Sequence, residues 1–139
     1  MLKLTKFLLV LFVTSLCLVQ ISCDSAEDCV TQEVSGFAAS DISYRIQIGA
    51  FSEEKNVQTD PFFDALAAGT NVESESVTNA DGDIITRYYA GGELATYQAA
   101  LDYLDTIDED YTDAFMVAFG SSTTRIGEVT DAMKASLCL

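Results

Sequence analysis

The sequence predicts an α+β domain: a four-stranded antiparallel sheet with helices on one face, plus a C-terminal helix. Three observations lead to this fold class. Apolar and polar residues alternate with the period of a strand in YRIQI, residues 44–48. Apolar residues recur at helical spacing over residues 97–107. The turn sequence NADGD, residues 79–83, separates two further strand-like segments and predicts a hairpin.

The first strand divides its side chains between two faces. Arg45 and Gln47 share one face, and the apolar residues share the other: Tyr44, Ile46 and Ile48. Gly49 permits a close approach of the backbone, so that Phe51 can fold back onto the core as the strand ends.

A short helix is predicted next, over residues 60–69. Asp60 can cap it, Pro61 suits its first position and Gly69 can end it. Residues 71–78 read as an edge-like strand, and residues 84–92 form its hairpin partner.

The second half of the domain repeats this order. Thr96 can cap the helix over residues 97–107, and the almost wholly apolar residues 113–119 predict a central strand. Residues 126–137 predict one more amphipathic helix. The order of strand, helix, strand, strand, helix, strand folds most economically as a split β-α-β repeat (βαββαβ) of the ferredoxin-like or RNP-like kind, which leaves one sheet face open.

The first 23 residues predict a signal peptide. Lys3 and Lys6 precede an apolar run that is short for a membrane span, which is the order of a secretory signal. The residues before Cys23 also resemble the end of a lipoprotein signal, so that acylation of Cys23 and simple cleavage both stay open. Residues 24–41 then read as a tether, residues 42–119 as the domain, and residues 120–139 as a helical extension.

The cysteines agree with export. Cys17 lies in the signal and Cys23 at its end, which leaves Cys29 and Cys138 as a pair that could bridge in an oxidising compartment. Two unpaired, half-buried thiols are the alternative.

The charge of the chain excludes some partners. The net charge is −15, and removal of the two lysines in the signal leaves 5 basic against 22 acidic residues, a charge of −17. Nucleic acid is therefore a poor partner, since phosphate binding needs clustered Lys and Arg. A membrane is expected as a partner only through an acyl anchor.

Catalytic and metal sites are not expected. The chain has no histidine, which excludes a nucleophile with a histidine base. A hydrolase using acidic residues alone, such as Glu73 with Asp83, is a third and weaker hypothesis. In a calcium loop centred on Gly82, Val77 and Tyr88 would stand where carboxylates are needed, so no metal or other cofactor is predicted.

Four polar residues are predicted to share the open face. The two halves of the chain align YRIQIGAF with TRYYAGG, which matches Arg45 with Arg87 and Gln47 with Tyr89. Guanidinium, amide and phenol groups together suit the hydroxyls, acetamides and C–H faces of a sugar chain. Alternatively, these residues keep an exposed face soluble and pair with Glu73 or Glu75.

The motifs YRIQIGAFS, RYYAGG and DAFMVAF resemble those of the SPOR (sporulation-related repeat) family over about residues 43–119. The resemblance implies a βαββαβ fold and binding of bacterial peptidoglycan, particularly glycan strands stripped of stem peptides. Gln47 matches the motif glutamine and Phe51 the motif aromatic, while Arg45, Arg87 and Tyr89 occupy neighbouring positions. Glu93 stands where the second motif usually has Phe.

The sequence therefore predicts a non-enzymatic, exported protein of the bacterial periplasm or cell envelope that binds peptidoglycan glycan strands. The alternative is an envelope module with the same fold that binds a protein partner through the sheet edge near residues 72–77 or an acidic helix face, and binds no glycan.

Overall fold

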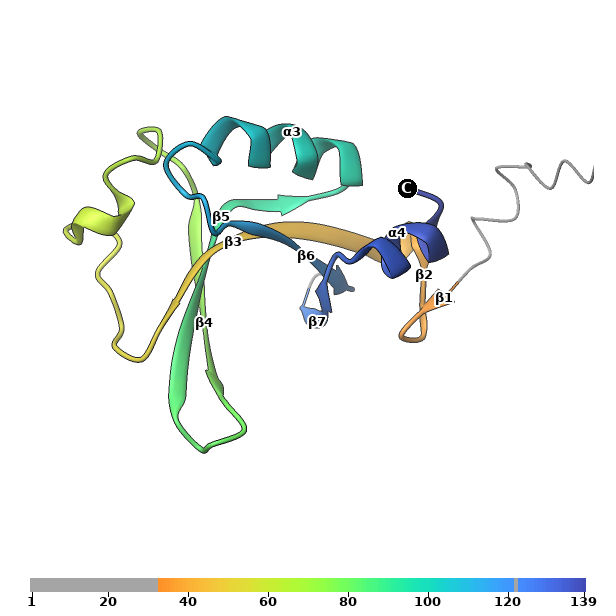
Figure 1. Ribbon diagram of the computed structural model, residues 1–139, viewed down its shortest axis with the longest axis horizontal. Coiled ribbons are helices and arrows are strands. Elements are labelled where there is room, and N and C mark those ends of the chain that lie inside the picture. The colour runs from red at the N-terminus through yellow and green to blue at the C-terminus, as the bar shows by residue number, and fades with distance from the viewer. Residues whose placement is uncertain (1–32, 122) are drawn as a thin grey trace, which may run out of the picture.

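The computed structural model describes residues 33–121 and 123–139, and shows an α+β domain with a curled antiparallel sheet (Figure 1). The main sheet has five strands in the order β4-β5-β3-β6-β7. Their bounds are β3 (Ile42–Phe51), β4 (Val72–Thr78), β5 (Ile84–Leu94), β6 (Phe115–Gly120) and β7 (Thr124–Glu128). A separate pair of strands precedes the sheet: β1 (Glu33–Val34) and β2 (Phe37–Ala38). The expected count of four strands is therefore wrong by one in the main sheet.

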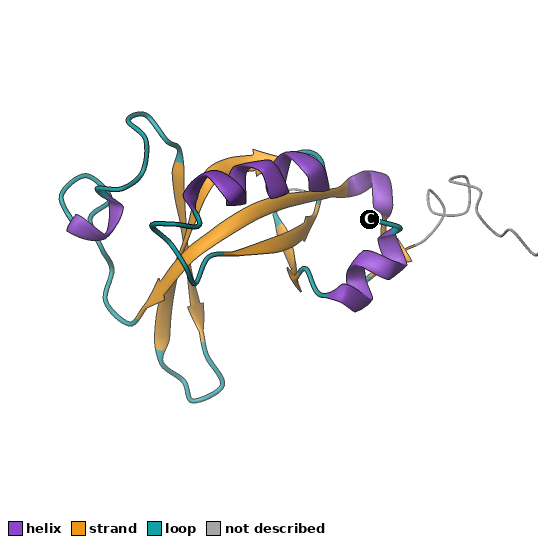
Figure 2. Cartoon of the chain, turned by 45° about the horizontal axis from the view of Figure 1, so that its top comes forward, coloured by secondary structure: helices purple, strands orange, loops and turns teal. Residues whose placement is uncertain are grey.

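The helical elements are two α-helices, α3 (Tyr97–Ile107) and α4 (Asp131–Leu137), and two 3-10 turns, η1 (Ala39–Asp41) and η2 (Pro61–Phe63). Helix α3 lies along the sheet and contacts β3, β5 and β6 (Figure 2). It begins as predicted, because Thr96 Oγ1 accepts a hydrogen bond of 3.1 Å from the Ala99 N–H. No helix in the described ranges is long and apolar enough to cross a membrane.

Strand β3 is central and has the predicted alternation. Its apolar residues join the main core beneath α3, and Ile46 is completely buried. Gly49 is needed where it stands, since a Cβ there would lie 2.7 Å from Phe51 Cε2 and 3.0 Å from Phe62 Cζ. The Phe51 ring meets the Phe62 ring edge to face at 4.9 Å, so the aromatic after the strand does fold back onto the core.

The β4–β5 hairpin turns at the predicted residues and extends away from the rest of the sheet (Figure 1). Asn79 Oδ1 accepts hydrogen bonds from the N–H groups of Asp81 and Asp83, at 3.0 and 2.8 Å. Gly82 supplies the positive φ of this turn, at 91°. The turn is therefore held by the local chemistry of an Asx residue and a glycine.

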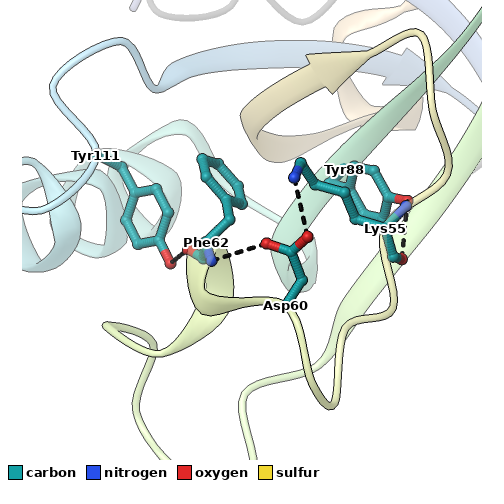
Figure 3. A network of polar contacts seen from close by, with 5 residues as sticks. All are labelled: Lys55, Asp60, Phe62, Tyr88 and Tyr111. Carbon is teal, nitrogen blue, oxygen red and sulfur yellow. Dashed lines mark hydrogen bonds and ion pairs between the residues drawn. The ribbon is translucent and has the colours of Figure 1, made fainter.

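The helix predicted over residues 60–69 is wrong in its extent, since only the 3-10 turn η2 forms. Asp60 does cap it, accepting a hydrogen bond of 2.9 Å from the Phe62 N–H. Tertiary contacts then hold the two phenylalanines. Tyr111 donates its hydroxyl to the Phe62 carbonyl at 2.7 Å (Figure 3). The Phe63 and Tyr88 rings lie 5.1 Å apart. A segment this short gains little from helix propagation, and burial of both aromatic rings decides its shape.

The helix predicted over residues 126–137 is also wrong in its extent. Residues 124–128 form β7, and α4 begins only after Thr130, whose hydroxyl accepts a hydrogen bond of 3.3 Å from the Met133 N–H. Strand β7 pairs with β6 and so satisfies backbone groups that an edge strand would leave open. Ile126 and Val129 still reach the main core, as the helical pattern required.

Part of the predicted tether belongs to the fold. Residues 33–41 form β1, β2 and η1, and Val34, Phe37 and Ala39 pack against the main core. The Phe37 ring lies where a Cβ of residue 120 would be, which explains Gly120 at the end of β6. Residues 33–41 therefore belong to the folded domain, although they lie ahead of the predicted boundary at 42.

Candidate functional site

The four predicted site residues lie on one face of the main sheet, opposite α3. In the register of β3 and β5, Gln47 faces Tyr89 directly, whereas Arg87 faces Ala50. The two strands run antiparallel, so residues that precede Gln47 and Tyr89 lie in opposite directions along the sheet. The register shift after Gln47 moves the partner of Arg87 from Gly49 to Ala50. The arginines therefore lie on either side of the Gln47–Tyr89 pair, and the match of Arg45 with Arg87 in the sequence is not a contact in space.

A small aromatic cluster lies on the same face, and Tyr89 is one of its members. It consists of Tyr89, Val117 and Phe119 with Phe115 packed against them, and it is separate from the main core. The Tyr89 and Phe119 rings meet edge to face at 5.6 Å. The residues of β6 were predicted to be buried but were not assigned to this face, although alternation along a strand that is apolar on both sides implies it.

Charged side chains cover the aromatic cluster. Arg45 Nη1 pairs with Glu73 Oε2 at 2.5 Å, and its guanidinium carbon lies 4.6 Å from the Phe119 ring centroid. Arg87 Nη1 lies 3.7 Å from Glu75 Oε2. The face is thus free of helices in the described ranges, yet its centre is not open, since Gln47 is 6% and Tyr89 only 1% exposed.

The pairing with Glu73 and Glu75 is the arrangement that the solubility alternative required. The same geometry places guanidinium and carboxylate groups together over aromatic rings. Sugar binding and solubility of the exposed face are therefore not exclusive hypotheses. Tyr89 connects the layers by donating its hydroxyl to Glu75 Oε2 at 3.0 Å.

Arg125 is a residue of this face that the sequence analysis missed. It lies on β7, separated from β5 by two strands in the sheet order, and faces Phe119 in register. Even so, its charge acts on the Tyr89 hydroxyl. Burial raises the pKa of Tyr89 most, the Glu75 carboxylate raises it further, and Arg125 acts in the opposite direction. A flat sheet would hold these residues much farther apart, so we call this side the concave face.

Three atoms on the concave face are buried without a hydrogen-bond partner in the described structure: Ser43 Oγ, Gln47 Oε1 and Arg125 Nε. The strand registers place all three residues on this face, because Ser43 and Arg125 both face Phe119, and Gln47 faces Tyr89. Buried polar atoms in native proteins nearly always have partners, so their gathering on one face marks it as unusual.

The other groups that could carry chemistry are metal ligands, the pair of carboxylates and the cysteines. No group of three or more metal-ligating residues in the described ranges could hold an ion. Glu73 lies near the start of β4 and Asp83 in the turn beyond its far end, about 17 Å or more apart at the rise of a strand, which is too far for a glycosidase pair. Cys138 takes part in a disulfide bond, whereas Cys29, its predicted partner, and Cys23, the predicted acylation site, lie outside the described residues.

No protein-family model matches the sequence, no curated protein matches it, and no solved structure matches its fold. The resemblance to the SPOR family therefore rests on the motif residues themselves.

Proposed function

We propose that this protein is exported and binds peptidoglycan glycan strands, particularly strands stripped of stem peptides, through the concave face. The strand order β4-β5-β3-β6 is the one that a split β-α-β repeat requires. We accordingly interpret the domain as a variant of that fold, in which η2 replaces the first helix and β7 extends the sheet.

The observation that carries the proposal is the set of unsatisfied buried atoms on the concave face. A bound sugar offers both donors and acceptors from its hydroxyl and acetamido groups, and so can satisfy acceptors such as Gln47 Oε1 and donors such as Arg125 Nε. The rings of Tyr89 and Phe119 lie on the same face beneath the ion pairs, and the C–H face of a sugar would reach them only after those pairs separate.

The ion pairs of the concave face are weak enough to open for a ligand. The side chains of Arg45 and Glu73 are 17% and 37% exposed, and those of Arg87 and Glu75 are 27% and 38% exposed. Ion pairs with this much solvent contribute only about 0.2–1 kcal/mol, so they can exchange partners for sugar hydroxyls at little cost. The local pairing also isolates the arginines from the strongly acidic remainder of the chain.

Co-sedimentation with purified sacculi tests the proposal, before and after an amidase has removed the stem peptides. We expect the mature protein to pellet, and to pellet more with stripped sacculi. Substituting Gln47→Ala together with Arg87→Ala should weaken binding by roughly tenfold or more, because hydrogen bonds to the sugar are lost. Lys134→Ala is the control, since Lys134 lies on α4 and pairs with Asp131 at 3.0 Å.

Unchanged pelleting of a folded Gln47→Ala, Arg87→Ala protein would contradict the proposal. An envelope module that binds a protein partner is the second candidate, favoured by the position of β4 at the edge of the sheet. In that case the purified protein would not bind sacculi, and a protein partner would be recovered with it from envelope extracts in stoichiometric amount.

A further inference from the structure

We infer that the concave face selects the acetamido group of its ligand, and that Arg125 is a binding residue for that group. This inference rests on the proposed function, because it names the chemical feature of the glycan that the face recognises. It concerns two of the unsatisfied atoms, Gln47 Oε1 and Arg125 Nε.

Gln47 Oε1 and Arg125 Nε have complementary roles in hydrogen bonding. Gln47 Oε1 is an acceptor without a donor, and the Nε–H of Arg125 is a donor without an acceptor in the described structure. A secondary amide carries one N–H and one C=O, which point in opposite directions within one rigid plane. One acetamido group can therefore donate to Gln47 Oε1 and accept from Arg125 Nε through two separate atoms. A hydroxyl would have to do both from one oxygen, although Gln47 and Arg125 lie on strands that β6 separates.

Both residues border Tyr89. Gln47 faces Tyr89 across the β3–β5 ladder, and the charge of Arg125 acts on the Tyr89 hydroxyl. The unsatisfied atoms therefore lie beside the aromatic cluster that Tyr89 forms with Phe119, Val117 and Phe115. The cluster is buried, with Tyr89 1% and Phe119 2% exposed, so the methyl of an acetamido group contacts it only where the ion pairs above it separate.

The charges around the site also favour a neutral group. Two ion pairs cover the aromatic cluster. Arg45 pairs with Glu73, and Arg87 pairs with Glu75. Glu128 on β7 pairs with Val117 in register and so lies on the same face as Arg125. An acetamido group can enter between the partly exposed pairs without bringing an unbalanced charge.

The experiment compares two soluble β-1,4-linked oligosaccharides of equal length, one of N-acetylglucosamine and one of glucose, by calorimetry with the mature protein. These sugars differ only in the acetamido group. We expect the N-acetylglucosamine oligomer to bind about tenfold or more tightly than the glucose oligomer, because the latter leaves buried polar atoms unsatisfied.

Two variants assign the selectivity to the named atoms. Gln47→Leu and Arg125→Met should each bring binding of the N-acetylglucosamine oligomer close to that of the glucose oligomer. Arg125→Lys should behave like Arg125→Met, since lysine keeps the charge but has no Nε–H at that position. Lys134→Met removes one positive charge from α4 and should leave both affinities unchanged.

Equal affinity for the two oligomers, or variants that weaken both equally, would overturn the inference. If Gln47→Leu does not fold, Arg125→Met decides the matter, because Arg125 is on an edge strand. Sacculus binding without selectivity between the oligomers would refute the inference and leave the proposed function standing. Selectivity for the acetamido oligomer without sacculus binding would support the inference and refute peptidoglycan as the ligand.

Discussion

Tyr89 is the residue at which the two layers of the concave face meet. Its ring packs on Phe119 within the aromatic cluster, while its hydroxyl donates to Glu75 in the charged layer. The motif resemblance assigned Tyr89 to an exposed binding surface, but the register and the burial place it beneath that surface. A ligand would therefore meet the charged layer first and the tyrosine only after the ion pairs have separated.

The burial of this tyrosine predicts a dependence of stability on alkaline pH. Burial and Glu75 raise the pKa of Tyr89, and burial and Tyr97 raise the pKa of Tyr44. The folded state thus holds these protons more tightly than the unfolded state, whose tyrosines titrate near pH 10. The stabilisation is fully present below about pH 10 and is lost as the pH rises through the folded-state values.

Urea unfolding between pH 7 and pH 11 should show this loss, with a smaller decline in Tyr89→Phe. That variant keeps the ring and removes the titrating hydroxyl. The same decline in wild type and variant would show that Tyr89 does not titrate as its burial implies.

At the scale of elements, the close packing of β5 against α3 depends on one glycine. Gly91 has φ of 85°, and a Cβ there would lie 2.6 Å from Tyr103 Cε1 of α3. Glycine therefore meets two requirements at once, a left-handed backbone and a close helix.

Gly91→Ala should lower the free energy of unfolding by about 2 to 5 kcal/mol, from backbone strain and overpacking together. Gly69 is the matched control, because its φ is 86° and a Cβ there would meet nothing within 4 Å. Gly69→Ala should cost only about 1 to 2 kcal/mol, the strain alone. Urea denaturation measures both, and equal losses would rule out the contact with Tyr103.

At the scale of the whole molecule, the two ends of the domain lie together. Helix α4 contacts β1, and Cys138 follows α4 directly (Figure 1). Cys138 forms a disulfide, and Cys29 precedes β1 by only a few residues in the chain. The pairing of Cys138 with Cys29 stays a prediction, because Cys29 lies outside the described residues.

We therefore expect non-reducing peptide mapping to recover Cys29 linked to Cys138. This bridge closes a loop of about 110 residues, so reduction should lower the free energy of unfolding by roughly 4 to 5 kcal/mol. A peptide linking Cys138 to Cys23 would contradict the pairing, and would also exclude acylation of Cys23. An unchanged unfolding midpoint after reduction would show that the bridge does not hold the ends of the domain.

The sequence alone determined the features that depend on neighbouring residues. The alternation of Tyr44 to Ile48 predicted both faces of β3, Asn79 and Gly82 predicted the hairpin turn, and Thr96 predicted the start of α3. Strand periodicity, Asx turns and helix caps act over a few residues, so the local pattern carries them. The shared face of the four predicted site residues followed from the same periodicity.

Only the tertiary structure decided the features that depend on distant partners. Residues 124–128 form a strand because they pair with the edge of β6. The helical segment at residues 61–63 is limited to one turn because Phe62 and Phe63 pack against aromatic rings that are distant in the sequence. The curl of the sheet brought Arg125 to Tyr89 and buried the centre of the concave face. These outcomes arise from pairing, packing and twist across the whole sheet, which no local pattern in the chain contains.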